Sequence, residues 1–135
     1  MIEHDFDRWN EKKKQIELSN HMLFPREGEV WMCVMGKNIG IEQNGSITDF
    51  VRPILVVKKF NNQMFWVVPL SGKQKRLDFY YNFTDPQRMD VSAILAQLRM
   101  MSTKRFMRKM YTLAANHYIR IRESLGAFLV IETPP

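Results

Sequence analysis

The chain has 135 residues, of which 45% are apolar and 25% charged, a balance typical of one globular domain rather than of a disordered or fibrous chain. Its longest apolar run, near residues 64–70, is much shorter than a membrane span, and the first residues lack the apolar stretch of a secretory signal, so we expect a cytoplasmic protein without membrane contact. The formal net charge of +6 favours polyanionic partners such as nucleic acid, although solubility alone would also account for it.

The first predicted element is a helix at residues 3–21, where apolar side chains recur at helical spacing between charged ones. Pro25 and Gly28 then interrupt the pattern, as residues of a loop do. We therefore expect an N-terminal helical extension at residues 1–25 and a main domain at residues 26–135.

The main domain begins with strand signals. Residues 29–35 form a nearly continuous apolar run, which predicts a strand buried on both faces. Residues 36–50 contain three glycines and little periodicity, which indicates a long loop of the kind that is often functional. Residues 51–73, VRPILVVKKFNNQMFWVVPLSGK, predict a β-hairpin, because two apolar runs flank the turn-forming pair Asn61 and Asn62.

The remaining elements are less regular. Residues 76–83 are rich in aromatic side chains and predict a third strand. Residues 91–102 fit a strand or a helix equally well, and residues 102–110 are short and basic, with no element assigned. An apolar stripe predicts a helix at residues 112–127, with Thr112 as its N-terminal cap.

Residues 128–135 fit either a last strand or a tail. Short, mostly antiparallel strands followed by a C-terminal helix indicate an α+β fold, a small β-barrel with helices added at both ends. Closure into a barrel would remove exposed strand edges.

The predicted hairpin places two polar groups together. Arg52 stands at the entrance of its first strand and Ser71 at the exit of its second, and paired strands lie about 5 Å apart. A guanidinium matches the geometry of a phosphate, and a hydroxyl beside it adds a donor and an acceptor. The two residues could thus form a phosphate site on the barrel rim, or be only a solvated charge and a turn hydroxyl.

The sequence gives little support to a nucleotide-binding loop, a metal site or a cofactor site. There is no Gly-rich phosphate loop and no HExxH or CxxC motif. His4, His21 and His117 are scattered, and Cys33 is the only cysteine, so we expect neither a metal site nor a cofactor. For His117 we predict a surface or packing role.

Several short blocks occur in a characteristic order: G-E-V-W at 28–31, G-x-E-Q at 40–43, R-P at 52–53, P-L-S at 69–71 and S…Q-L-R…S-x-x-R at 92–105. In these blocks the chain resembles the MazF/PemK family of bacterial toxins, from about residue 26 to residue 125. The resemblance implies an SH3-like barrel that is usually a homodimer. It does not extend to residues 1–25.

The resemblance also implies an activity, which is metal-independent cleavage of single-stranded RNA by a toxin of a toxin–antitoxin module. The RNA 2′-hydroxyl attacks the adjacent phosphorus and leaves a 2′,3′-cyclic phosphate. Arg52 matches the family's catalytic arginine, and Ser71 falls where the family usually has threonine. The residues that we expect to contact RNA beside these two are Lys37, Glu42, Gln43 and Lys73.

One position departs from the family pattern. Some relatives carry an acidic residue just before the glutamine of the Q-L-R block, and here that position is Ala96. Glu42 is then the nearest candidate for the proton acceptor. The departure favours an alternative, a non-catalytic nucleic-acid-binding module in which bases stack on Trp31, Trp66, Tyr80 and Tyr81. A second alternative is a topoisomerase poison related to CcdB, which would act through the C-terminal helix.

The charge distribution suggests a protein partner as well. The positive excess lies after residue 21, and we expect much of it near the RNA groove. An antitoxin with an acidic, partly disordered segment should occupy the same groove, because such a segment is also a linear polyanion. The basic residues expected there are Lys37, Arg52, Lys58, Lys59, Lys73, Lys75 and Arg76.

Overall fold

The computed structural model describes residue 8 and residues 23–36 and 51–130. The helix predicted at residues 3–21 lies outside the described residues, except for Arg8, which is helical. The predicted loop at residues 36–50 also lies outside them, apart from its first glycine.

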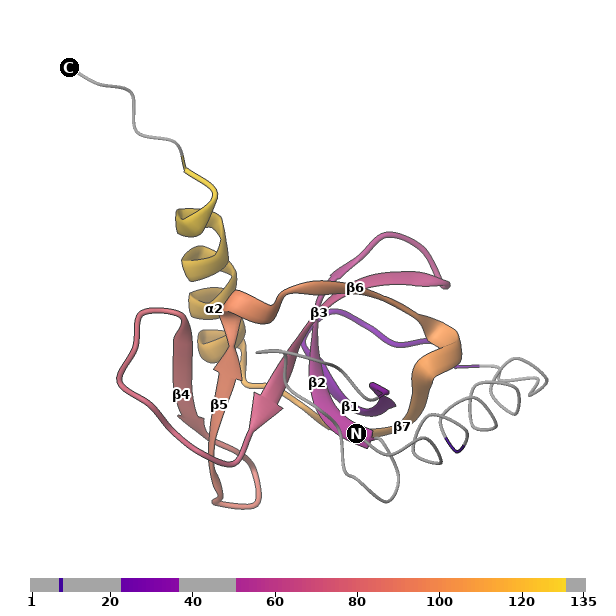
Figure 1. Ribbon diagram of the computed structural model, residues 1–135, viewed down its shortest axis with the longest axis horizontal. Coiled ribbons are helices and arrows are strands. Elements are labelled where there is room, and N and C mark those ends of the chain that lie inside the picture. The colour runs from indigo at the N-terminus through magenta and orange to yellow at the C-terminus, as the bar shows by residue number, and fades with distance from the viewer. Residues whose placement is uncertain (1–7, 9–22, 37–50, 131–135) are drawn as a thin grey trace.

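The described residues form an antiparallel β-structure with one long helix near the C-terminus (Figure 1). Two short 3₁₀-helices, Leu95–Gln97 and Thr103–Arg105, flank the sixth strand. The strands and the helix are β1 (Glu29–Val34), β2 (Val51–Lys59), β3 (Met64–Ser71), β4 (Tyr80–Thr84), β5 (Asp90–Ile94), β6 (Arg99–Ser102), β7 (Phe106–Thr112) and α2 (Ala115–Phe128).

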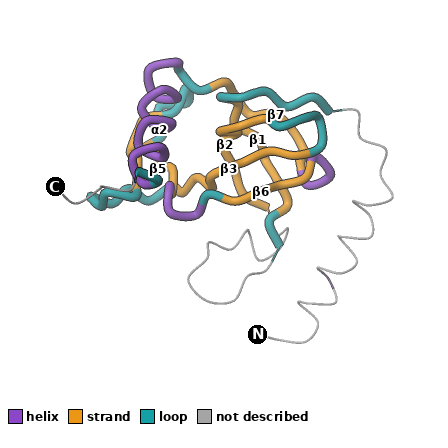
Figure 2. Tube along the Cα trace, turned by 90° about the horizontal axis from the view of Figure 1, so that it is seen from above, coloured by secondary structure: helices purple, strands orange, loops and turns teal. Residues whose placement is uncertain are grey.

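Strand β3 is the branch point of the sheet. Its first half pairs with β6, its end pairs with β5, and β2 lies along its other edge. Strands β6-β3-β2-β1-β7 curl into a small barrel, while β5 and β4 extend to one side and are covered by α2 (Figures 1 and 2). The expected α+β small barrel is confirmed, although in the described part no strand pairing joins β6 to β7 to close it.

The central strands are buried on both faces, as predicted for residues 29–35. In β1, Val30 belongs to one apolar cluster and the next residue, Trp31, to another. One cluster fills the barrel interior and includes Phe106. The other lies between the outer face of the sheet and α2, which contributes Ile121 and Leu125. Burial on both faces requires apolar side chains at successive positions, which explains the continuous apolar runs in the sequence.

The hairpin prediction is confirmed at its turn. The Asn61 side-chain oxygen accepts hydrogen bonds from the backbone N–H groups of Gln63 and Met64, at 2.8 and 3.0 Å. Asparagine side chains commonly close turns in this way. The strand predicted at residues 76–83 is β4, which is shorter than predicted and begins at Tyr80, because residues 72–79 first cross to the far side of β5.

Residues 91–102 prove to be strand at both ends, β5 and β6, with a 3₁₀ turn between them. The basic segment 102–110, to which the sequence assigned no element, contains most of β7. Outward-pointing basic residues hide its strand pattern, since only its first residue, Phe106, is fully buried.

The predicted start of the C-terminal helix was wrong. Thr112 is not a cap but the last residue of β7, where it pairs with Glu29 of β1. Leu113 is buried and donates its N–H to the carbonyl of Gly28 at 2.8 Å, so pairing with β1 continues past the strand. Helix α2 begins only at Ala115, without a side-chain cap, and it includes Phe128, which the sequence placed in a last strand or tail.

Candidate nucleic-acid interface

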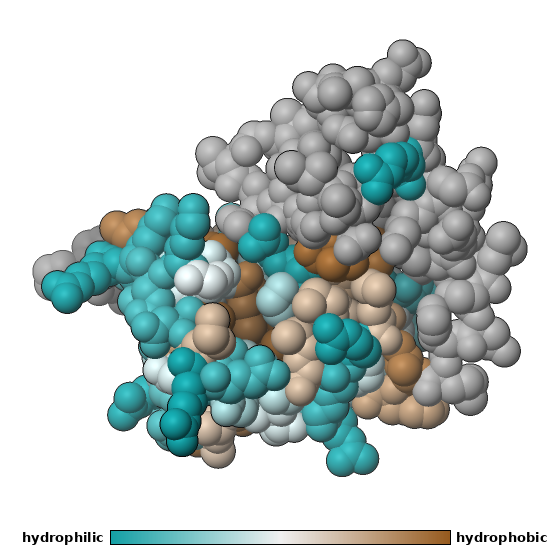
Figure 3. All heavy atoms as spheres, turned by 90° about the horizontal axis from the view of Figure 1, so that it is seen from below, coloured by the Kyte–Doolittle hydropathy of each residue, from teal (hydrophilic) through white to brown (hydrophobic). Residues whose placement is uncertain are grey.

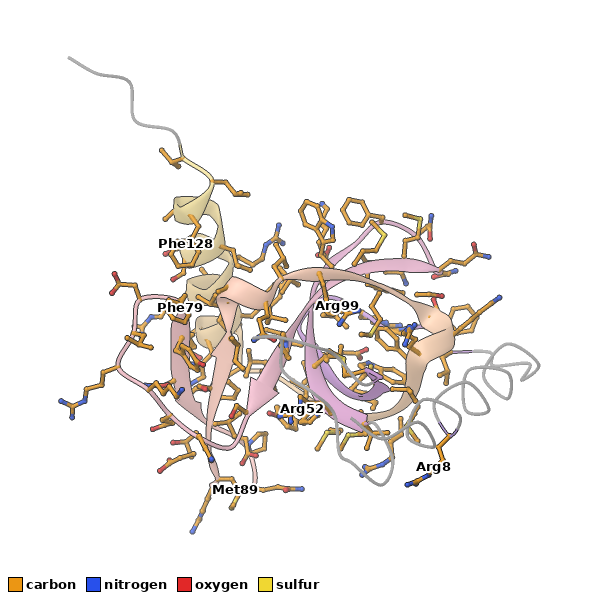
Figure 4. All side chains as sticks on the ribbon, viewed as in Figure 1. Arg8, Arg52, Phe79, Met89, Arg99 and Phe128 are labelled. Atoms are coloured by element: carbon orange, nitrogen blue, oxygen red, sulfur yellow. The ribbon has the colours of Figure 1, made fainter. Side chains whose placement is uncertain are left out.

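Arg52 and Ser71 lie on neighbouring strands at the same end of the hairpin. The last pair of the β2–β3 ladder is Ile54 with Pro69, and the same register extended by two residues would set Arg52 opposite Ser71. Alternation along each strand puts both residues on the face that carries Ile54. Figure 4 shows Arg52 beside the tip of β3. The structure therefore brings together the two residues that the sequence singled out.

The same row of the sheet continues across two more strands. Ser71 pairs with Ser92 of β5, and Ser92 pairs with Asn82 of β4. Their neighbours in sequence pack into the cluster under α2, so these side chains point to the opposite face, toward Arg52 and Ser71. We call Arg52, Ser71, Ser92 and Asn82 the polar row.

Hydrogen bonds hold the segment that follows β3 against this face of the sheet. Ser92 Oγ donates to the carbonyl of Lys73 at 2.9 Å, and Asn82 Nδ2 donates to the carbonyl of Lys75 at 3.0 Å. Between them, Gln74 Nε2 donates to one carbonyl of β4 and one of β5, at 3.2 and 3.1 Å. In Figure 1 this segment, residues 72–78, passes in front of β5 and β4. We refer to it as the strap.

The strap also orients the Ser71 hydroxyl. Ser71 Oγ accepts the backbone N–H of Lys73 at 3.2 Å, which fixes the side chain while its own hydrogen can still be donated. Arg52 is half-buried, and this loss of water lowers the pKa of its guanidinium. Because an arginine starts from a very high pKa, Arg52 remains positively charged at neutral pH.

Exposed basic residues follow Ser71 directly in the strap, namely Lys73, Lys75 and Arg76. Figure 3, a view from below, shows hydrophilic residues gathered on the side of β4 and β5. The expectation that Lys58 and Lys59 lie near the same groove was wrong. They occupy the far end of β2, about 20 Å along the strand from Arg52.

Other predicted site residues are placed differently. Lys37, Glu42 and Gln43 lie outside the described residues. Lys73 sits in the strap, next to the polar row. Ala96 is exposed in the 3₁₀ turn that follows β5.

The aromatic residues suggested for base stacking are not equally accessible. Trp31 is buried inside the barrel, where its ring packs edge-on against Phe106. Tyr81 packs on the α2 side, and its hydroxyl lies 2.7 Å from Nδ1 of His117. Neither can hold a base, so that part of the alternative was wrong, whereas the packing role predicted for His117 is confirmed.

Sequence reasoning missed Ser92, Asn82 and Gln74. Ser92 opens the S…Q-L-R block, but nothing in the block says that it pairs with Ser71. The signal that could have found these residues is strand alternation, which requires β4 and β5 to be correctly bounded first.

No three His, Cys, Asp or Glu side chains of the described part of the chain lie together as a possible metal site. None of its helices is long and apolar enough to cross a membrane.

Comparison with known families gives one match. Residues 26–129 match the model of the PemK-like, MazF-like toxin of type II toxin–antitoxin systems. No curated protein sequence matches the chain.

Solved structures with a similar fold are MazF toxins. MazF (Form-I) from Deinococcus radiodurans superposes with a TM-score of 0.67 at 18% identity, over 79% of this chain and 97% of that chain. MazE-MazF (Form-II) from the same organism gives 0.60 at 16% identity, over 82% and 99%. The Mycobacterium tuberculosis toxin MazF-mt6 gives 0.56 at 11% identity, over 73% and 93%. At these identities the likeness shows a shared fold.

Proposed function

The chain belongs to the PemK-like, MazF-like toxins of type II toxin–antitoxin systems, and from this we propose that it is a metal-independent endoribonuclease acting on single-stranded RNA. The observation that carries the proposal is that Arg52 and Ser71 lie at the same end of the β2–β3 hairpin, each two residues beyond the Ile54–Pro69 pair. Family membership supplies the chemistry, and this geometry offers residues that can perform it.

In the proposed reaction the RNA 2′-hydroxyl attacks the adjacent phosphorus, the bond to the 5′-oxygen breaks, and a 2′,3′-cyclic phosphate remains. Negative charge builds up on the non-bridging oxygens of the phosphorane. The Arg52 guanidinium stabilises that charge with fixed donors, and partial burial strengthens the interaction because less water competes for it. We also propose Arg52 as the donor of the proton that the leaving oxygen takes up, which requires its pKa to fall further in the RNA complex.

Ser71 has a narrower role in this scheme. Its hydroxyl, held by the Lys73 N–H, donates to a phosphate oxygen or to the 2′-oxygen. Glu42 is proposed as the acceptor of the 2′-hydroxyl proton, with Gln43 and Lys37 contacting RNA from the same segment. Lys73 contributes a positive charge next to Ser71.

The partners follow from the family. We propose that an antitoxin neutralises the protein in the cytoplasm and that the active form is a homodimer. Support for an antitoxin comes from the similarity to a MazF that was solved with MazE.

One observation favours the non-catalytic alternative. Ala96 is exposed beside the end of β5, where some relatives have an acidic side chain. If no other group accepts the proton, the same surface binds RNA without cutting it. The experiment below separates the two functions because it measures binding and cleavage independently.

The test compares single-site variants on one single-stranded RNA. We expect Arg52→Ala to lower the cleavage rate by about 10²- to 10³-fold, because a donor to transition-state charge is lost. Ser71→Ala should lose less, and Ser71→Thr should keep most of the activity, since it retains the hydroxyl. The matched control is Arg120→Ala, which removes an exposed arginine of α2 outside the strap and should leave the cleavage rate unchanged.

Thermal melting of each variant excludes unfolding as the cause. Arg52 is at a strand end outside both apolar clusters, so its loss should change stability little. Full cleavage by Arg52→Ala with a wild-type melting curve would show that the site is elsewhere. Wild-type protein that binds RNA but never cleaves it would establish the non-catalytic alternative.

A further inference from the structure

An exposed aromatic ring stands at the start of β4, at the end of the strap. Phe79 is 38% exposed, and its ring centroid lies 5.1 Å from that of Tyr80 at an interplanar angle of 54°. The ammonium of Lys75 lies over the Tyr80 ring, 5.6 Å from the ring centroid. Tyr80 thus contacts both the exposed ring of Phe79 and the charged end of Lys75. We call Lys75, Phe79 and Tyr80 the aromatic platform.

The backbone under the platform is held in place. Tyr80 N–H donates to the carbonyl of Leu77 at 2.9 Å, and Leu95 N–H donates to the carbonyl of Phe79 at 2.7 Å. Asn82 of the polar row holds the carbonyl of Lys75. A ring fixed in this way loses little conformational freedom when something stacks on it.

Tyr80 of the platform shares a sheet face with Arg52 and Ser71, and Phe79 precedes it in the turn that leads into β4. Tyr80 alternates with Tyr81, which packs under α2, so Tyr80 points to the face of the polar row. Tyr80 lies two strands away from Ser71 and is displaced by two residues along the strand direction. The separation of the two residues is therefore about 12 Å. Figure 4 shows Phe79 at the start of β4 and Arg52 beyond β5 and the tip of β3. A few extended nucleotides would bridge this distance.

We propose that Phe79 is a base-stacking subsite for single-stranded RNA, with Lys75 contacting the phosphate beside the stacked base. The proposal rests on the RNA-directed function above and extends it by naming a second contact point a few nucleotides from the cleaved bond. Every base has an aromatic face, so the subsite adds affinity and sets how the strand lies, while hydrogen bonds elsewhere select the sequence.

The chemistry of the platform favours nucleic acid over an acidic peptide. A run of carboxylates would satisfy Lys75 but would leave the Phe79 ring in water. A nucleotide satisfies both, since it joins a flat aromatic base to a phosphate. Docking of a protein partner on Phe79 is the competing outcome, which the experiment distinguishes.

The experiment measures binding of an uncleavable RNA, a 2′-O-methyl oligonucleotide in which 2-aminopurine replaces one base at a time. The emission of 2-aminopurine falls when it stacks. Wild-type protein should quench one position a few nucleotides from the cleaved bond. Phe79→Leu should abolish that quenching and weaken binding about 5- to 150-fold, and Phe79→Trp should restore both.

Two further variants and a base-paired RNA serve as controls. Leu77→Ala removes an apolar side chain of similar exposure from the same strap and should change neither readout. Lys75→Gln should weaken binding without moving the quenched position. It should also reduce by about one the slope of the logarithm of the binding constant against the logarithm of the salt concentration. A hairpin RNA with the same bases paired should show no quenching, because its bases are already stacked.

The outcomes separate the two proposals. Position-specific quenching that is lost in Phe79→Leu supports the platform, even if the wild-type protein turns out not to cleave RNA. Unchanged affinity and quenching in Phe79→Leu would overturn it while leaving the cleavage site intact. If wild-type protein binds no oligonucleotide, or if Phe79→Leu affects only the binding of an acidic protein partner, the platform is not an RNA subsite.

Discussion

At the scale of single residues, two charged side chains are partly removed from water. Arg52 is half-buried at the sheet end, and burial lowers the pKa of its guanidinium. Glu29 is buried in β1 and is paired within the protein. Its carboxylate accepts from Trp31 Nε1 at 3.0 Å and from the Arg26 N–H at 2.7 Å, and it pairs with Lys109 Nζ at 2.9 Å.

The combined effect of burial and the three partners stabilises the charged form of the Glu29 carboxyl. Burial alone would raise the pKa of the carboxyl, but the bonds from Lys109, Trp31 and Arg26 together outweigh burial and lower it. The folded state therefore binds this proton less readily than the unfolded state. The stability that Glu29 contributes is present above the ordinary value of 4.5 and is lost as the pH falls through the lower folded value.

We therefore predict that Glu29→Gln lowers the free energy of unfolding by about 1–3 kcal/mol at pH 7, because the ion pair with Lys109 is lost. The difference from wild type should shrink below pH 4.5, as the native carboxyl becomes protonated. Urea unfolding at several pH values measures this. The control is Glu123→Gln, an exposed position on α2. A Glu29→Gln defect of the same size at pH 3 as at pH 7 would contradict the assignment.

At the scale of elements, the sequence predicted what apolar runs and turn chemistry control. The hairpin and β1 are recognisable because burial on both faces requires continuous apolar residues. Strand β7 was missed because basic residues cover its outer face, and β4 began later than predicted because the strap precedes it. That Arg52 and Ser71 lie at the same end of the hairpin could be predicted from that hairpin alone.

The polar row could not be predicted in full. Ser92 and Asn82 reach it only through pairings between β3, β5 and β4, which depend on long-range topology. Around Ser92 the sequence gives no clear periodic signal, because the 3₁₀ turn at residues 95–97 interrupts the strand pattern. Local sequence thus identifies the two central residues, and the sheet register adds the others.

Helix α2 is expected to hold the β4-β5 side of the sheet through a narrow apolar stripe. Ile121 is fully buried in the apolar cluster that includes Phe83 of β4 and Ala93 of β5, whereas Ile119, on the same helix, is 53% exposed. We predict that Ile121→Ala lowers the free energy of unfolding by about 2–5 kcal/mol. Ile119→Ala should change it by less than about 0.5 kcal/mol. Equal losses for the two variants in urea unfolding would mean that α2 does not pack as described.

At the scale of the whole molecule, the basic strap together with Arg52 and Ser71 forms one surface that should attract linear polyanions of either kind. We predict that polyglutamate, a stand-in for an acidic antitoxin segment, competes with labelled uncleavable RNA. Both affinities should fall as salt rises, because counterions are released on binding. Fluorescence anisotropy at several salt concentrations measures this. Simultaneous binding without loss of RNA affinity would rule out a shared surface.

The central claim is that Arg52 and Ser71 cleave RNA through its own 2′-hydroxyl. The most direct measurement incubates purified protein with single-stranded RNA in excess chelator and analyses the product ends. The account predicts a 2′,3′-cyclic phosphate on one fragment and a 5′-hydroxyl on the other, with neither formed by Arg52→Ala. Cleavage that requires added magnesium, or that leaves a 3′-hydroxyl and a 5′-phosphate, would contradict it.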